Sequence, residues 1–378
     1  MFLVFSLVFV ALTTVSFVRA VTNPANGTSL SSRSAEWARA HGFGAIVSWA
    51  ENELYKLHPP KTGGAPAAGS FAQGTTAPVT LANALPAPAR LPSPAGAWLP
   101  GEGVWHAAGR SVLGVPAVYT TTVRPDATHT SYVVGVAWMD MRLMKASLYS
   151  GSQIPGGATF DETAPIPPTS SATLVAAFNA GFRMTDAHGG YYTDRKTIVA
   201  LRPGAASLVI YKDGSVALGA WGSQVTMTPS VVSVRQNLSL IVNGAKAVPG
   251  LIASDNFRWG ATLGGGAYVW RSGIGETRNG AFVYVGGPSL SITSLANLLV
   301  DAGAVRAMEL DINPDWVQYS TFTGPMGNGL RGPNYGGASL LSSMAGAPSR
   351  YFTKWWARDF FTVSARSAVQ IRPMAASE

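Results

Sequence analysis

Residues 280–316 read GAFVYVGGPSLSITSLANLLVDAGAVRAMELDINPDW, and the spacing of apolar residues changes twice within them. Residues 280–287 are typical of a strand. Residues 291–303 have leucines on one face, a serine or threonine cap at the start and Gly303 at the end, which predicts a helix. Residues 304–313 again predict a strand. Strand, helix and strand in so few residues indicate a crossover unit, whose ligands usually lie beyond the carboxyl ends of the strands.

The rest of the region from 103 to 370 predicts antiparallel sheet. PAVYTTTVR, SYVVGVAWMD and LMKASLYSG are typical strands, and the unbroken apolar run in SATLVAAFNAGF favours a central one. Asp213-Gly214 and Asn243-Gly244 lie between alternating runs, which predicts two hairpins. We expect a mixed α/β (α+β) fold of twisted, largely antiparallel sheets with hairpins and one strand-helix-strand crossover, as a single globular domain after an N-terminal membrane segment.

The first 20 residues, MFLVFSLVFVALTTVSFVRA, are uncharged until Arg19 and about as long as the shortest transmembrane helices. They predict a signal anchor or a signal peptide, hence a protein bound to the cell membrane by one span or secreted, and extracytoplasmic in both cases. The alternative is a buried helix of a soluble protein. Four further regions are expected: a helical juxtamembrane segment at 21–58, a Pro/Ala/Gly-rich linker at 59–102, the globular domain at 103–370 and a tail at 371–378.

Composition excludes several classes of site. The chain has no cysteine, so disulfide scaffolds, thiolate zinc sites and cysteine nucleophiles are impossible. The formal charge of +8 favours anionic partners, but the basic residues are scattered and no recognition module is present, so no nucleic-acid partner is expected. Motifs of the GxSxG, HExxH and Walker types are absent. Five histidines do not favour a histidine-rich zinc site, and we expect no bound metal there.

Three acids lie at the end of the last predicted strand in MELDINPDW, residues 308–316. Alternation along a strand places Glu309, Asp311 and Asn313 on one face, while Pro314 ends the strand and Asp315 begins the loop. Two carboxylates on one face suit acid-pair chemistry such as glycoside cleavage, where they lie about 5 Å or about 6.5 to 9.5 Å apart. The alternatives are a solvated strand end and an oxygen-ligated divalent cation. No other cofactor is expected.

Two more polar clusters could bind a substrate. In FNAGFRMTDAHGGYY, residues 178–192, Arg183 and His188 could donate hydrogen bonds, and Tyr191 or its neighbour Tyr192 could stack on a ring. The alternative is an ordinary glycine-rich connection with a structural histidine. In VWRSGIGETRNG, Arg271 could hold a phosphate through a forked pair of hydrogen bonds, or could cap a hairpin.

The order of these motifs resembles the phosphodiester glycosidase domain, the family of the lysosomal enzyme that uncovers mannose 6-phosphate and of exported bacterial relatives. FNAGF and GGYY come first, then the LSLIVNGAKAVPG hairpin, WRSGIG, a strand, a leucine-rich helix and a strand closing on LD. The resemblance covers roughly residues 170 to 365. It implies a mixed α/β fold and hydrolysis of the bond between an anomeric carbon and a phosphodiester oxygen, with a carbohydrate phosphodiester as the substrate.

The resemblance also implies roles for single residues. Asn179 and Gly181 match the family's Asn-Ala-Gly segment, Arg271 and Gly275 match Arg-x-x-x-Gly, and Asp311 matches the aspartate of Leu-Asp-Gly-Gly-Gly-Ser. Ile312-Asn313-Pro314-Asp315 stands here where the family has glycines and serine. Pro314 has no amide hydrogen to offer an anion. Asn313 and Asp315 are candidates to replace that loop.

Together the residues predict an exported hydrolase that cleaves the glycosidic C–O bond of a sugar-1-phosphodiester, in a cell-envelope glycopolymer. Asp311 is expected to be one catalytic carboxylate, and Glu309 or Asp315 the second. The expected substrate-binding residues are Asn179, Gly181, Arg183, His188, Tyr191, Arg271, Gly275 and Asn313. Two alternatives are kept: a non-catalytic glycan-binding module of the envelope, and a metal-dependent phosphodiesterase.

Overall fold

Three β-sheets form the body of the computed structural model, which describes residues 2–74, 82–156, 160–252, 256–260, 266–324, 335–353 and 356–371. All pairs between the named strands are antiparallel. The largest sheet has the order β1 (His106–Val112), β2 (Val115–Val123), β3 (Val134–Met139), β14 (Phe282–Leu290), β13 (Val269–Thr277), β15 (Ala304–Glu309), β11 (Leu240–Asn243) and β12 (Lys246–Ala247).

The other two sheets have five strands each. The second sheet has the order β7 (Lys196–Val199), β6 (Tyr191–Thr193), β10 (Val231–Gln236), β8 (Ala206–Tyr211) and β9 (Val216–Ala220). The third has the order β17 (Gly337–Ser339), β16 (Tyr319–Phe322), β5 (Leu174–Asn179), β18 (Phe360–Ala365) and β4 (Met144–Tyr149). The expected fold class is therefore confirmed as a mixed α+β domain with largely antiparallel sheets and few helices.

The predicted strand-helix-strand crossover is present. β14 and β15 both pair with β13, which lies between them, and α7 (Ile292–Asp301) connects them. Ser291 caps α7 through a reciprocal pair of hydrogen bonds with Ser294, and Gly303 follows the helix with a φ of 95°. The predicted hairpins at Asp213-Gly214 and Asn243-Gly244 join β8 to β9 and β11 to β12, and β5 is the central strand of its sheet.

The expected strand at residues 304–313 is wrong at its end, because β15 stops at Glu309. Leu310 and Asp311 still exchange backbone hydrogen bonds with Ser272. Beyond them, the side chain of Asp311 accepts hydrogen bonds from the backbone amides of Ile312 and Asn313, which turns the chain away from the sheet. The simple alternation expected from Glu309 to Asn313 therefore does not hold.

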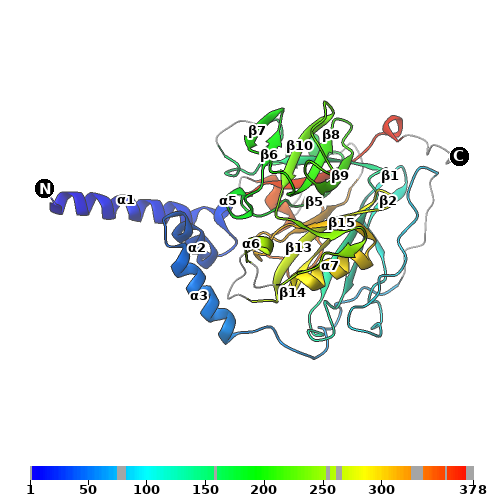
Figure 1. Ribbon diagram of the computed structural model, residues 1–378, viewed down its shortest axis with the longest axis horizontal. Helices are drawn as coiled ribbons and strands as arrows, with labels where there is room; N and C mark the ends of the chain where they lie inside the picture. Colours follow the sequence, from blue (N-terminus) through cyan, green and yellow to red (C-terminus); the bar gives the residue numbers. More distant parts are fainter. Residues whose placement is uncertain are drawn as a thin grey trace.

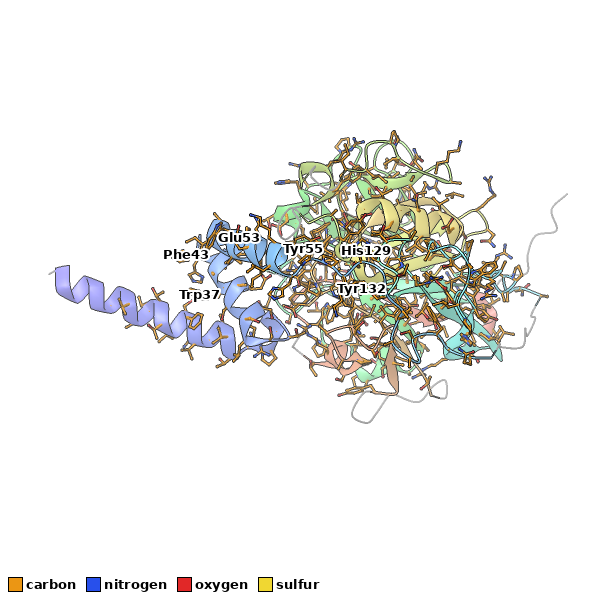
Figure 2. The ribbon with its side chains drawn as sticks, turned by 90° about the horizontal axis from the view of Figure 1, so that it is seen from below. Trp37, Phe43, Glu53, Tyr55, His129 and Tyr132 are labelled. Carbon is orange, nitrogen blue, oxygen red and sulfur yellow. The ribbon has the colours of Figure 1, made fainter. Side chains whose placement is uncertain are left out.

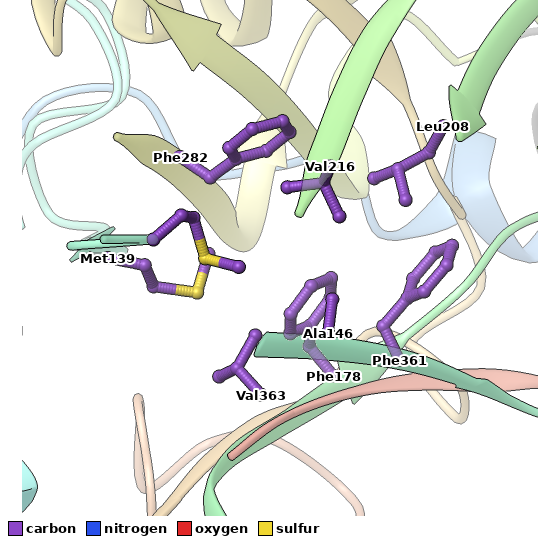
Figure 3. Close-up of a pocket in the computed structure, with 9 residues that line it drawn as sticks. Met139, Ala146, Phe178, Leu208, Val216, Phe282, Phe361 and Val363 are labelled. Carbon is purple, nitrogen blue, oxygen red and sulfur yellow. The ribbon is translucent and has the colours of Figure 1, made fainter. Parts of the chain in front are cut away.

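Two apolar cores lie on the two faces of the largest sheet. On β14, Phe282 and Tyr284 join the inner core, to which all three sheets contribute, and Val283 and Val285 join the outer core under α7. Figure 1 shows the second sheet at the top of the domain and α7 in its lower half. The inner core is close-packed: a cavity of about 10 Å³ remains between its side chains, which has room for no more than a water molecule (Figure 3).

The N-terminal part is helical. α1 (Phe2–Thr22) projects from the domain, while α2 (Leu30–Ala40) and α3 (Gly44–Leu57) lie between α1 and the sheets (Figure 1). Within the described part of the chain, no helix is both long and apolar enough to span a membrane, so the membrane segment expected at residues 1–20 is not shown.

The remaining described elements are short. They are α4 (Pro168–Ser171), α5 (Met184–Ala187), α6 (Asn256–Trp259) and the 3-10 turns Pro24–Asn26, Pro348–Phe352 and Ala368–Gln370. In the Pro-rich segment 59–102, Leu85 and Leu91 pack into the outer core, and buried Glu102 pairs with Arg124 at 2.9 Å. Residues 75–81 of that segment and 372–378 of the expected tail lie outside the described residues.

Candidate active site

Two buried carboxylates lie where β15 ends. Glu309 is 1% exposed and Asp311 is 2% exposed. Each is paired with a different arginine: Glu309 Oε1 lies 2.5 Å from Arg271 Nη1, and Asp311 Oδ2 lies 2.9 Å from Arg358 Nη1. Buried charges in proteins are usually paired with an opposite charge, as they are here. The strand end that the sequence singled out therefore holds two carboxylates with separate cationic partners.

Burial of Glu309 favours the neutral form of its carboxyl group. Burial raises the pKa of Glu309 to about 7, although the charge of Arg271 acts in the opposite direction. Arg271 is held in turn by the carbonyl of Leu290, to which its Nε donates at 3.0 Å. Among the described residues, Glu309 Oε2 and Arg271 Nη2 have no hydrogen-bond partner. A carboxyl group with both protonation states populated near pH 7 can act as a general acid or base.

Asp311 is fixed by its own backbone as well as by Arg358. Its Oδ1 accepts hydrogen bonds from the amides of Ile312 at 2.8 Å and Asn313 at 2.9 Å. Burial raises the pKa of Asp311, and Arg358 and the two amides oppose that rise. The main chain of Asp311 is anchored to β13, because its carbonyl accepts from the amide of Ser272 at 2.8 Å. This carboxylate is therefore rigid.

Asn179 joins the third sheet to the largest sheet beside Asp311. Its Nδ2 donates to Ser272 Oγ at 3.0 Å, and its Oδ1 accepts from Tyr284 Oη at 2.9 Å and from the amide of Gln318 at 3.2 Å. Ser272 Oγ also accepts from the amide of Asp311 at 3.2 Å. The side chain of Asn179 is engaged within the protein. Its geometry is therefore suited to positioning Ser272 and, through Ser272, Asp311.

A carboxylate from the N-terminal segment enters the same site. Glu36 of α2 lies between two arginines, with Oε2 at 3.2 Å from Arg183 Nη1 and Oε1 at 3.2 Å from Arg358 Nη2. Arg358 therefore bridges Glu36 and Asp311. Arg183 also pairs with Asp186 at 3.0 Å. These contacts place α2 over the end of β15.

The loop that replaces the expected glycines is closed by its own side chains. Asn313 Oδ1 accepts from the amide of Asp315 at 2.9 Å. Asp315 Oδ1 accepts a hydrogen bond from the hydroxyl of Thr28, and the carbonyl of Asp315 accepts from Arg350 Nη1 at 3.1 Å. The N-terminal segment therefore touches this loop at Asp315, in addition to the contacts of Glu36 with Arg183 and Arg358.

Four of the expected binding residues have surroundings that differ from those expected of a substrate-binding residue. Tyr191 is fully buried, and its hydroxyl lies 2.9 Å from Ser150 Oγ, so against expectation its ring offers no face to a ligand. His188 is exposed, with a left-handed φ of 49°. A Cβ on Gly181 would lie 3.4 Å from Arg235 Nη2, and a Cβ on Gly275 would lie 2.6 Å from Ala304 Cβ. Gly275 thus serves the packing of β13.

Sequence reasoning missed four charged residues of the site. Arg235 and Asp359 form a third buried pair, with 2.6 Å between Nε and Oδ2, and the other two are Arg358 and Glu36. Arg358 and Asp359 directly precede β18, a mostly buried strand whose first residue pairs with Asn179. Two adjacent charged residues before a buried strand could have identified Arg358 and Asp359 from the sequence. Glu36 lies in a polar helix and offered no such signal.

The acids near Asp311 are engaged by arginines, hydroxyls and backbone amides. Among the residues that the structure describes, no group of three or more His, Asp or Glu side chains is placed to hold a metal ion.

Comparison with known proteins reveals distant structural similarity. No family model and no curated protein matches the sequence. The catalytic domain of zebrafish N-acetylglucosamine-1-phosphodiester alpha-N-acetylglucosaminidase, auto-inhibited by its pro-peptide, is 15% identical over 69% of this chain and 88% of that one, with a TM-score of 0.41. A hypothetical protein from Synechocystis is 12% identical over 67% of this chain and 63% of that one, with a TM-score of 0.32. A protein from Burkholderia pseudomallei described as exported is 13% identical over 62% and 74%, also with a TM-score of 0.32. Identities and TM-scores this low do not establish a family.

Proposed function

We propose that this chain is an extracytoplasmic hydrolase that cleaves the glycosidic C–O bond of a sugar-1-phosphodiester in a cell-envelope glycopolymer. The observation that carries the proposal is the pair of buried carboxylates, Glu309 and Asp311, at one strand end beside three arginines. This is the chemistry implied by the order of sequence motifs. Acid-pair cleavage needs two carboxyl groups with different protonation, and here their surroundings differ.

The two carboxyl groups have separate roles in this proposal. Glu309, with its pKa near 7, donates a proton to the phosphodiester oxygen as the C–O bond breaks. Asp311, held by Arg358 and two amides, either attacks the anomeric carbon or activates a water molecule. The products are a free sugar and a phosphomonoester. Asp315 is the weaker candidate for the second carboxylate, because Thr28 and the loop engage it.

The arginines around Glu36 support an anionic substrate. Glu36 is a carboxylate held between Arg183 and Arg358, which is the arrangement that a phosphodiester oxygen would also satisfy. The substrate would replace Glu36, and α2 would move away from the strand end. Arg271, whose Nη2 has no partner among the described residues, is the third cation of the proposed site.

The proposal is tested by incubating the full chain with a panel of sugar-1-phosphodiesters in oxygen-18 water and weighing both products. Label on the free sugar, lost in Asp311→Asn but kept in the control Asp213→Asn, is the expected result. Asp213 is a suitable control because it lies in the turn between β8 and β9. Label on the phosphate together with sensitivity to chelators would instead indicate a metal-dependent phosphodiesterase. Full turnover by Asp311→Asn would show that Asp311 is not a catalytic residue.

A second candidate function is a non-catalytic glycan-binding module. The observation that favours it is that Asp311, Glu309 and Asp315 all have partners within the protein, and that Glu36 of α2 occupies Arg358 beside Asp311. Binding of a glycan by the full chain without any product across the panel would support this candidate over hydrolysis.

A further inference from the structure

A pocket of about 420 Å³ lies between the end of α3 and the ends of β13 and β14. Its aromatic lining consists of Tyr55, Tyr132, Tyr268 and Trp270. Figure 2 shows Tyr55 at the end of α3 beside Tyr132 and His129. The Tyr268 ring packs on His129 with 4.0 Å between centroids, and its carbonyl accepts from Tyr55 Oη at 3.2 Å. Sites for small ligands have volumes of about 300 to 1,000 Å³, so the size suits one.

The chemistry of the lining suits a sugar ring. A pyranose has an apolar face of C–H groups and a rim of hydroxyls, and tyrosine and tryptophan offer an apolar face with a polar edge. Glu51, His58 and Ser289 supply polar groups among the aromatic and proline residues of the lining. A purely aliphatic ligand would bury some of these polar groups without hydrogen bonds, which is unfavourable.

Ser289 is the most informative residue of the lining. It is 3% exposed, and its Oγ has no hydrogen-bond partner among the described residues. Its backbone has a φ of 58°, in the left-handed region that serine rarely adopts. Residues with both features concentrate at functional sites, where a ligand can supply the missing partner.

The pocket borders the proposed catalytic carboxylates. Ile312 and Pro314, from the loop after Asp311, form part of its lining. Tyr55 also lies within reach of the charge of Arg271: burial raises the pKa of Tyr55, and Arg271 opposes that rise. Arg271 is the partner of Glu309. A ring bound here would therefore lie beside the reacting bond.

We propose that this pocket binds one uncharged sugar ring of the glycan, next to the phosphodiester that is cleaved. The inference rests on the proposed function for the identity of that neighbouring bond. Binding of a ring in the pocket is measured without turnover, so the two ideas can fail separately.

The test is calorimetric titration of the full chain with neutral trisaccharides of glucose and of N-acetylglucosamine. Tyr268→Ala should weaken binding roughly tenfold, while Tyr268→Phe, which keeps the ring, should bind as the wild type does. Tyr211→Ala is the matched control, because Tyr211 is a half-buried tyrosine on β8 in the second sheet. Unfolding midpoints measured for each variant identify any loss of binding that comes from loss of the fold.

Ser289→Gly separates a binding role from a structural one. Glycine adopts the left-handed conformation readily, so the unfolding midpoint should rise or stay unchanged. Loss of the hydroxyl should nevertheless weaken trisaccharide binding roughly fivefold. A purely structural role would leave binding unchanged.

Three results would refute sugar binding in this pocket: no trisaccharide binds the wild type, binding survives Tyr268→Ala unchanged, or a simple alkyl chain binds there and sugars do not. Hydrolysis of a sugar phosphodiester with a KM that Tyr268→Ala does not change would also refute sugar binding in the pocket, while leaving the proposed function intact. Binding that depends on Tyr268 in a protein without turnover would support the pocket and refute the hydrolase.

Discussion

Replacing Glu309 with glutamine should change how stability depends on pH. The pKa of Glu309 is raised by burial to about 7 in the folded protein, from an ordinary value of 4.5. Between these two values the unfolded chain releases the proton and the folded chain keeps it. Glu309 therefore contributes less to the free energy of unfolding of the wild type as the pH rises from about 4.5 to about 7, because the unfolded state binds fewer protons than the folded state in that range.

The size of the effect follows from the difference in pKa. A difference of about 2.5, at about 1.4 kcal/mol for each unit, corresponds to about 3 kcal/mol. Glutamine does not titrate, so Glu309→Gln lacks this loss. Relative to the wild type, the variant should gain about 3 kcal/mol of stability between pH 4.5 and pH 7.

Urea unfolding of both proteins at several pH values between 4.5 and 8 measures the difference. Glu102→Gln is the matched control, because Glu102 is also a buried glutamate paired with an arginine, Arg124. Burial acts to raise the pKa of Glu102, but hydrogen bonds from Arg124 hold it below its ordinary value. Its contribution is therefore lost only as the pH falls below about 4.5, and the gap between Glu102→Gln and the wild type should stay constant over the measured range.

A constant gap between Glu309→Gln and the wild type, within about 1 kcal/mol from pH 4.5 to 8, would refute the reasoning. It would mean that Arg271 holds Glu309 ionised in spite of its burial. The general-acid role of Glu309 would then lose its physical basis, although Asp311 would remain a candidate.

Three further variants test the site and the fold. Glu36→Gln should lower the KM for an anionic substrate several-fold by freeing Arg183 and Arg358, whereas Glu53→Gln, on exposed α3, should not; an unchanged KM would contradict competition by Glu36. Gly275→Ala should lower the free energy of unfolding by about 1 to 3 kcal/mol, because its Cβ would meet that of Ala304 at 2.6 Å. Ser291→Ala should cost about 1 kcal/mol by removing the cap of α7. Urea unfolding measures both, and unchanged stability would contradict them.

The elements predicted well from the sequence are those whose signals are local. The crossover around α7 was visible because the leucine spacing and Gly303 lie within a dozen residues. The two hairpins were visible because each turn has an Asx-Gly pair between alternating runs. The end of β15 was misplaced because the side chain of Asp311 bonds the next two amides, a competition that an alternating pattern does not reveal.

The partners of the acids could not be predicted in the same way. Arg358 reaches Asp311 because β18 pairs with β5, and β5 reaches β13 through Asn179 and Ser272. Those pairings depend on the arrangement of the sheets, which no short stretch encodes. Tyr191 was expected at a binding surface from its place in a glycine-rich loop, but β6 is covered and buries the ring.

Two arginines hold a carboxylate from α2 over this site. Arg183 and Arg358 each have a carboxylate partner of their own, Asp186 and Asp311, and both arginines share Glu36. A phosphodiester carries one negative charge as well. Exchange of Glu36 for such a group would leave the net charge of the site unchanged, so the binding free energy would depend on the stronger forked hydrogen bonds of the phosphate and on the cost of moving α2. A neutral substrate that displaced Glu36 would supply no negative charge in place of the two ion pairs that Glu36 makes.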